Sequence, residues 1–213
     1  MEPGVGALRL IPMTLLAQRT SAPSSPLTQL ALTPRLARRE TGADAPRTWL
    51  TPGFGSSTAY INLSPGLVCV FDSGGFQGLT HQGIGAAGMT AHQAWNAAAA
   101  QLEPRAYCAA GVEFMVRSPA VALGIEGHPP GFEVDGHGCP AASWLAHPRT
   151  FTLLHRHFEA VMHPEHNLVY ATRDDKELFV FDAPADAVAQ LLRNAAVMTY
   201  SVGFPLLHHS LRS

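Results

Sequence analysis

From Thr58 onward the chain repeats one order of local patterns, two strands and then a helix, and this order restricts the fold more than any other feature. The order occurs over residues 58–102, over 110–162 and, most compactly, over 167–198. Paired strands between the helices interrupt the strict strand–helix alternation of a parallel sheet. The sequence therefore predicts an α+β fold, a mainly antiparallel sheet with about three helices packed on one face.

Individual elements have local signals. Thr90 and Gln93 form a capping box ahead of a helix that ends at Pro104, and Pro148–Met162 has a continuous apolar face. Pro184 is expected to begin the last helix, and the tail from Gly203 is expected to be irregular. Short apolar runs bounded by turn residues predict strands at Tyr60–Leu63, Leu67–Phe71, Gly111–Val116, Ala120–Ile125, Phe132–Val134, Leu168–Thr172 and Leu178–Phe181.

Residues 1–57 differ from the rest because a proline recurs about every ten residues. Proline removes a backbone donor and interrupts both helices and central strands. Only Leu27 to Arg39 has the pattern of a short helix, and Pro34 would limit it. We expect residues 1–57 to form a Pro-rich, partly irregular N-terminal arm and residues 58–213 to form a single α+β domain.

The composition restricts the partners. Charged residues make up 14% of the chain, against roughly 25% in globular proteins. Apolar and small residues must then cover much of the surface, which favours self-association into a homo-oligomer. A net charge of −2 gives no electrostatic basis for nucleic-acid binding, and no apolar run approaches a membrane span. The single lysine beside many arginines and alanines is typical of a GC-rich bacterial genome, so we expect a soluble, cytoplasmic bacterial protein.

The main concentration of reactive side chains lies between His128 and His166, which holds seven of the eleven histidines and Cys139. Cys139 stands directly before Pro140, a residue that often begins a helix, and a cysteine at a helix N-terminus has a stabilised thiolate. His137 is two residues away. Cys139 and His137 are therefore candidate catalytic residues, and Cys139 should be alkylated faster than Cys69 or Cys108, which are expected to be buried.

The same region contains a candidate zinc site. Its four ligands would be His128, His137, Cys139 and His147, since imidazole and thiolate are the usual zinc ligands. Their spacing lacks the closely paired ligands of structural zinc motifs. We expect the chain to bind no cofactor, and zinc at these four residues is the alternative.

Two other motifs have simpler interpretations. Gly83–Gly88 reads G-x-G-x-x-G, but no buried strand precedes it and the capping box starts the helix after its last glycine, so we interpret it as a loop. His155 and His157 fall on a predicted helix, where residues two apart point in different directions. His155, Glu159 and His163 share one side of that helix, and we interpret them as a solvated polar stripe.

These observations leave two hypotheses for the function. The first is a non-catalytic protein-interaction or structural module that associates with itself or with another protein, because common hydrolase and nucleotide-binding motifs are missing. The second is a metal- or thiol-dependent enzyme of the hydrolase type, with its site around Gly136–His147.

Overall fold

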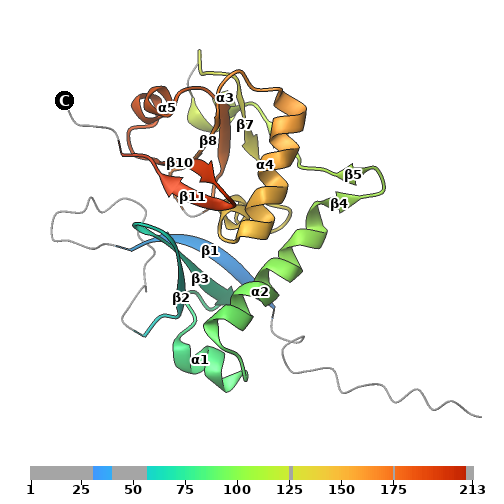
Figure 1. Cartoon of the computed structure of the whole chain (residues 1–213), viewed down its shortest axis with the longest axis vertical. Helices are drawn as coiled ribbons and strands as arrows, with labels where there is room; N and C mark the ends of the chain where they lie inside the picture. Colours follow the sequence, from blue (N-terminus) through green and yellow to red (C-terminus); the bar gives the residue numbers. More distant parts are fainter. Residues whose placement is uncertain (1–30, 40–56, 125–126, 175, 210–213) are drawn as a thin grey trace, which may run out of the picture.

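The computed structural model of the chain describes residues 31–39, 57–124, 127–174 and 176–209 (Figure 1). The described strands form a three-stranded sheet, a six-stranded sheet and a two-stranded hairpin, and all their pairings are antiparallel. Five α-helices pack among them. The predicted α+β class is confirmed, although the strands form more than one sheet.

The three-stranded sheet lies in the lower half of Figure 1 and has the order β1-β3-β2. Its strands are β1 (Leu32–Arg38), β2 (Tyr60–Ser64) and β3 (Leu67–Ser73). The helices beside it are α1 (His81–Ala86) and α2 (Ala91–Leu102). The predicted capping box of α2 is present in full, and its buried face of mainly small residues packs on β1. The Gly83–Gly88 motif falls on α1 and the turn after it.

Strand β1 corrects the prediction for the N-terminal arm. The short helix predicted within Leu27–Arg39 is wrong, because β1 is paired along its whole length with β3. Pro34 is tolerated because β1 is an edge strand. The buried Arg35 donates to both carboxylate oxygens of Asp72 at 2.7 and 3.2 Å, which compensates its charge. The rest of the predicted arm, 1–30 and 40–56, lies outside the described residues, and the boundary at residue 57 stays a prediction.

The six-stranded sheet has the order β11-β10-β8-β9-β7-β6. Its strands are β6 (Val116–Arg117), β7 (Gly131–Val134), β8 (Leu168–Thr172), β9 (Phe179–Asp182), β10 (Ala196–Ser201) and β11 (Phe204–Leu207). Helices cover both faces rather than the single face predicted. Helix α4 (Pro148–Met162) packs against the hydrophobic cluster on one face of the sheet. Helix α5 (Ala185–Leu191) packs against a second hydrophobic cluster on the other face. The reason lies in β8, whose five residues are all buried, so that its side chains enter the two cores alternately.

Two other segments differ from the prediction. The strand predicted at Ala120–Ile125 is instead helix α3 (Pro119–Leu123), which has a proline at its start and ends at Gly124 with φ of 63°. Proline at the first position and glycine just past the end are standard helix boundaries. The tail predicted to be irregular contains β11, which pairs with β10 across a tight turn in which Val202 and Gly203 both have positive φ. A turn of that kind matches the twist of a hairpin.

Helix α4 begins and ends where the sequence predicts. His147 caps it, since the imidazole Nδ1 accepts from the amide of Arg149 at 3.1 Å. Phe151, Leu154 and Phe158 are buried as expected, whereas Val161 is 55% exposed. Within the described ranges, no helix combines the length and the hydropathy that crossing a bilayer would need.

Two 3-10 helices complete the described structure. Helix η2 (Glu103–Ala106) leads into a hairpin of β4 (Tyr107–Cys108) and β5 (Gly111–Val112), which projects from the body in Figure 1. Helix η3 (Ala141–Leu145) is buried at all five residues and contacts both β1 and α4. It therefore connects the two halves of the molecule.

The burial of β1 yields a stability prediction. Leu36 is fully buried, so Leu36→Ala should lower the free energy of unfolding by about 2–5 kcal/mol. The matched control is Leu206→Ala on β11, where the side chain is 46% exposed and the loss should stay below about 1 kcal/mol. Chemical denaturation measures both. Equal, small losses would mean that β1 is not part of the core.

Candidate functional site

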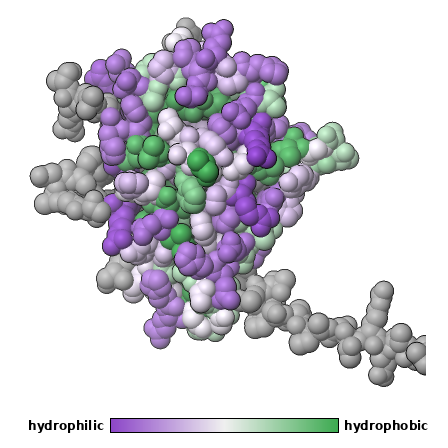
Figure 2. All heavy atoms as spheres, in the orientation of Figure 1, coloured by the Kyte–Doolittle hydropathy of each residue, from purple (hydrophilic) through white to green (hydrophobic). Residues whose placement is uncertain are grey.

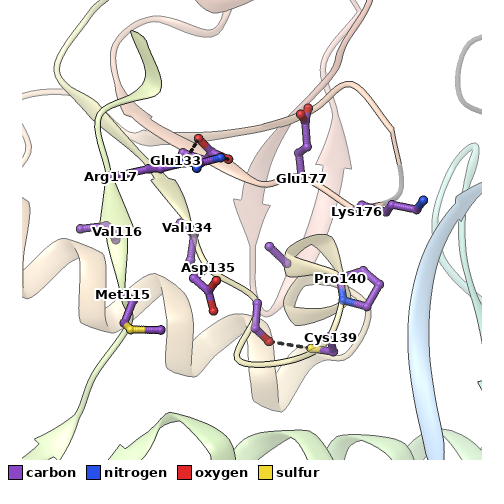
Figure 3. Close-up of a pocket in the computed structure, with 12 residues that line it drawn as sticks. Met115, Val116, Arg117, Glu133, Val134, Asp135, Cys139, Pro140, Lys176 and Glu177 are labelled. Atoms are coloured by element: carbon purple, nitrogen blue, oxygen red, sulfur yellow. Dashed lines mark hydrogen bonds and ion pairs between the residues drawn. The ribbon is translucent and has the colours of Figure 1, made fainter. Parts of the chain in front are cut away.

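A groove of about 540 Å³ opens at the β6 edge of the six-stranded sheet (Figure 3). We call it the β6 groove. Four segments of the chain contribute to it, and they come from β6, the end of β7, the start of η3 and the loop before β9. Its lining residues are Met115, Val116, Arg117, Glu133, Val134, Asp135, Gly136, Cys139, Pro140, Ala141, Lys176 and Glu177.

The groove forms because the strand predicted at Gly111–Val116 is interrupted. Phe114 turns into the core, where its ring centroid lies 4.9 Å from that of Trp144. The chain then resumes as β6, in which Val116 pairs with Val134 of β7. On its other side β6 has no strand neighbour among the described residues. The rim of the groove is therefore an open sheet edge.

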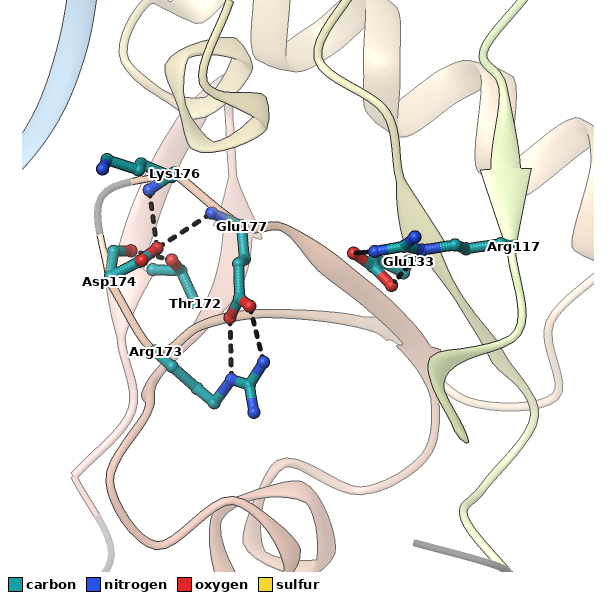
Figure 4. Close-up of polar contacts among 7 residues, drawn as sticks. All are labelled: Arg117, Glu133, Thr172, Arg173, Asp174, Lys176 and Glu177. Carbon is teal, nitrogen blue, oxygen red and sulfur yellow. Dashed lines mark hydrogen bonds and ion pairs between the residues drawn. The ribbon is translucent and has the colours of Figure 1, made fainter. Parts of the chain in front are cut away.

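Both glutamates of the groove lining are paired with arginines (Figure 4). Arg117 donates to both carboxylate oxygens of the buried Glu133, at 2.6 Å each. Arg173 holds Glu177 in the same manner, at 2.7 and 2.5 Å. Such two-point pairing between guanidinium and carboxylate fixes both groups in position. These pairs leave little net charge in the lining.

The loop that carries Lys176 is held by its own turn. The Asp174 carboxylate accepts from the amides of Lys176 and Glu177 at 2.8 and 3.0 Å. The carbonyl of Lys176 accepts from the amide of Ala141 at 2.6 Å, which ties this loop to η3. The Lys176 side chain is exposed and has no ion-pair partner within the described part of the chain. Asp135 is also an exposed charge of the lining, and its carboxylate accepts from the amide of His137 at 2.8 Å.

The predicted catalytic residue Cys139 lies in the groove but not at a helix N-terminus. Helix η3 begins at Ala141, with Pro140 in the capping position. Burial raises the pKa of the Cys139 thiol to about 11. The thiol donates to the carbonyl of Gly136 at 2.8 Å, a bond that only the protonated form can make. The prediction of a stabilised thiolate is therefore wrong.

His137, the predicted partner of Cys139, faces elsewhere. Its Nε2 donates to the carbonyl of Glu113 at 3.1 Å, and its amide donates to the Asp135 carboxylate at 2.8 Å. Its ring lies against Phe114, with centroids 5.5 Å apart. No hydrogen bond within the described residues joins His137 to Cys139. His137 and Gly138 both have positive φ, and this loop holds the groove wall in shape.

The four predicted zinc ligands lie in separate environments. His128 donates from Nδ1 to the carbonyl of Pro129 at 2.8 Å, whereas His147 caps α4 and lies against Trp95 at a centroid distance of 4.3 Å. Within the described ranges, no group of three or more His, Cys, Asp or Glu side chains is placed to hold a metal ion. The structure therefore does not bring His128, His137, Cys139 and His147 together.

A second polar cluster was not predicted from the sequence. His155 is only 13% exposed, and its imidazole lies between the hydroxyl of Tyr170 at 2.8 Å and the Glu159 carboxylate at 3.3 Å. It also stacks on Tyr200 at 3.8 Å. The interpretation of His155 as part of a solvated stripe is therefore wrong. Tyr170 and Tyr200 belong to β8 and β10, and no local pattern could link them to α4.

Burial lowers the pKa of His155. Both ring nitrogens are occupied by Tyr170 and Glu159, so neither is directed at a ligand. A polar pocket of about 830 Å³ lies beside the cluster. On its wall His166 pairs with Asp182 at 3.2 Å. This arrangement supports the packing of α4 on the sheet.

Comparison of the chain with protein-family models, with curated proteins and with solved structures gives no match. The geometry of the β6 groove is therefore the basis for a function.

The cysteines give a prediction about reactivity. Cys108 is exposed, contrary to the expectation from the sequence, whereas burial raises the pKa of both Cys139 and Cys69. In dilute solution at neutral pH, alkylation should be fastest at Cys108, slower at Cys139 and slowest at the fully buried Cys69, because the thiolate is the reactive form. Mass spectrometry of peptides after timed labelling measures the order. Cys139 reacting first would contradict the buried, protonated thiol.

The cap of α4 gives a prediction about pH. Burial of the imidazole, together with the Arg149 guanidinium, lowers the pKa of His147 to about 4 from the ordinary 6.5. Between these values only the unfolded chain binds the proton, so the free energy of unfolding should fall as the pH drops from 6.5 to 4, by at most about 3 kcal/mol. His147→Asn keeps a capping oxygen and removes this titration. Denaturation at several pH values should therefore show a shallower slope in the variant, and equal slopes would contradict the assignment.

Proposed function

We propose that this chain is a non-catalytic protein-binding module, with the β6 groove as its binding surface for an extended polypeptide segment. The observation that carries the proposal is the open sheet edge at Met115–Arg117, bordered by a groove of about 540 Å³. An exposed edge offers backbone donors and acceptors to an added strand, and an adjacent groove accepts its side chains.

The chemistry of the rim supports this proposal. Met115 is 57% exposed and Val116 is 42% exposed, so both offer apolar surface to a partner. The guanidinium of Arg117 and the carboxylate of Glu133 are already bound to each other. A groove of this kind favours a segment with few charges. Self-association is consistent with it, since the whole chain has only 14% charged residues.

The alternative, a thiol- or zinc-dependent enzyme around Gly136–His147, has less support. Its nucleophile would be Cys139, whose thiol is half-buried and bound to the Gly136 carbonyl. A general base would have to lie within hydrogen-bond reach of that thiol, and His137 is bound to the Glu113 carbonyl instead. Binding without chemistry therefore fits the groove better.

Selection of peptides tests the proposal. A displayed library of random eight-residue peptides is panned against the whole chain, and the affinity of the enriched peptides is measured by calorimetry. Val116→Glu places a charge at the rim and should weaken binding at least about tenfold, which is about 1.4 kcal/mol. Amide shifts on binding should fall on the β6 groove.

The matched control is Val161→Glu on α4. Val161 is similarly exposed, at 55%, and lies outside the groove lining, so this variant should bind the enriched peptides as the parent chain does. Peptides that bind equally to both variants would refute the groove as their binding surface, and a selection that enriches none would refute the role of the chain in binding other proteins.

A further inference from the structure

Among the described residues, the hairpin of β4 and β5 projects clearly from the body (Figure 1). Tyr107 pairs with Val112 and Cys108 pairs with Gly111, and the amide of Glu113 extends the ladder by donating to the carbonyl of Ala106 at 2.8 Å. A two-stranded hairpin of this length has little stability of its own in water. Packing against another surface would stabilise it.

Between Tyr107 and Val112 the hairpin has no charged side chain, and the exposed Glu113 follows at the end of its ladder. Residues 107–112 are Tyr, Cys, Ala, Ala, Gly and Val, and only Val112 packs partly on the core. Tyr107 is 53% exposed, and the four residues after it are also exposed. In Figure 2 the tip of this projection is green and pale green, without the purple of hydrophilic residues. A projecting apolar hairpin on a monomer is a surface that association would bury.

The β6 groove is complementary to such a hairpin. Each of its two glutamates is bound to an arginine, its rim is an open sheet edge, and Met115 and Val116 are apolar. An uncharged strand that enters along β6 would therefore leave both ion pairs intact. The groove and the hairpin are also adjacent, because Phe114 alone separates the end of the hairpin ladder at Glu113 from Met115 of the rim.

From this complementarity we infer that the occupant of the β6 groove is the β4–β5 hairpin of a second copy of the chain. The inference rests on the proposed function, because it names the partner of the same groove. Each copy gives its hairpin to the groove of the other, so that the two contacts are related by a two-fold axis and the assembly closes at two copies. The outer edge of the hairpin pairs with β6 and continues the six-stranded sheet across the interface.

The first experiment measures mass in solution. Light scattering on the full chain should give twice the 22.7 kDa mass of one chain at high concentration and should approach one chain on dilution. Ala109→Asp puts a charge at the hairpin tip and should raise the dissociation constant at least about tenfold. Its melting temperature should equal that of the parent chain at dilutions where both are monomers. The matched control is Ala100→Asp at an exposed position of α2, which should leave the mass unchanged. A monomer at every concentration would overturn the inference.

The second experiment tests which surfaces meet. The first chain has Cys139→Ser and keeps Cys108 on the hairpin. The second chain has Cys108→Ser, Cys139→Ser and Val116→Cys, so its only exposed thiol lies at the groove rim. Mixing the two under mild oxidation with copper phenanthroline should give a disulfide between Cys108 and position 116 of different copies. Replacing Val116→Cys with Val161→Cys is the control and should give little cross-linking. Equal cross-linking in both mixtures, or none in either, would overturn the proposed contact.

These results separate the inference from the proposed function. Peptides that bind to the groove in a manner dependent on Val116, while the full chain remains monomeric, would overturn the hairpin exchange and leave the binding module intact. A dimer cross-linked at Val116 that binds no selected peptide would support the exchange and overturn the broader role in binding other proteins. Ala109→Asp should bind the selected peptides at least as tightly as the parent chain, because its groove is no longer occupied.

Discussion

The structure depends on the burial of η3 between its two halves. This segment contacts β1 of the three-stranded sheet and α4 of the six-stranded sheet, and Trp144 at its centre is fully buried. Hydrogen bonds hold it on several sides, since the Trp144 carbonyl accepts from Thr150 at 2.9 Å and the Ala146 carbonyl accepts from the indole of Trp95 at 2.7 Å. A short 3-10 helix pairs few of its own backbone N–H and C=O groups. These hydrogen bonds offset the free-energy cost of burying it.

Elements with strong local signals could be predicted from the sequence. The capping box of α2 and the proline at the start of α4 fix helix boundaries within a few residues, and both helices occur as expected. Strand β1 could not be predicted, because Pro34 and Arg35 disfavour a strand in isolation. The pairing with β3 and the bond from Arg35 to Asp72 reverse that preference, and both involve residues far away in the sequence.

The candidate site was located only in part. Gly136 and Cys139 do line one wall of a groove. The stabilised thiolate predicted for Cys139, however, required a helix that begins at Pro140, directly after this cysteine. Helix η3 begins at Ala141 instead, and burial raises the pKa of the Cys139 thiol, which donates to the carbonyl of Gly136. The other walls come from β6 and from the loop at Lys176, which the sequence separates by about sixty residues. Pairing between Arg117 and Glu133 likewise follows from the register of β6 on β7 and has no local signature.

The position of β1 has a consequence for how the chain acquires its structure. Synthesis starts at the N-terminus, so β1 leaves the ribosome well before β3 and long before η3, which is encoded about a hundred residues later. Until η3 is available, the side of β1 that contacts it has no covering surface. Contacts between such distant segments form slowly, because a long loop must close before they can stabilise anything. Strand β1, the first strand of the described residues, is thus among the last to reach its final surroundings, and a nascent chain halted before residue 145 would carry it incompletely packed.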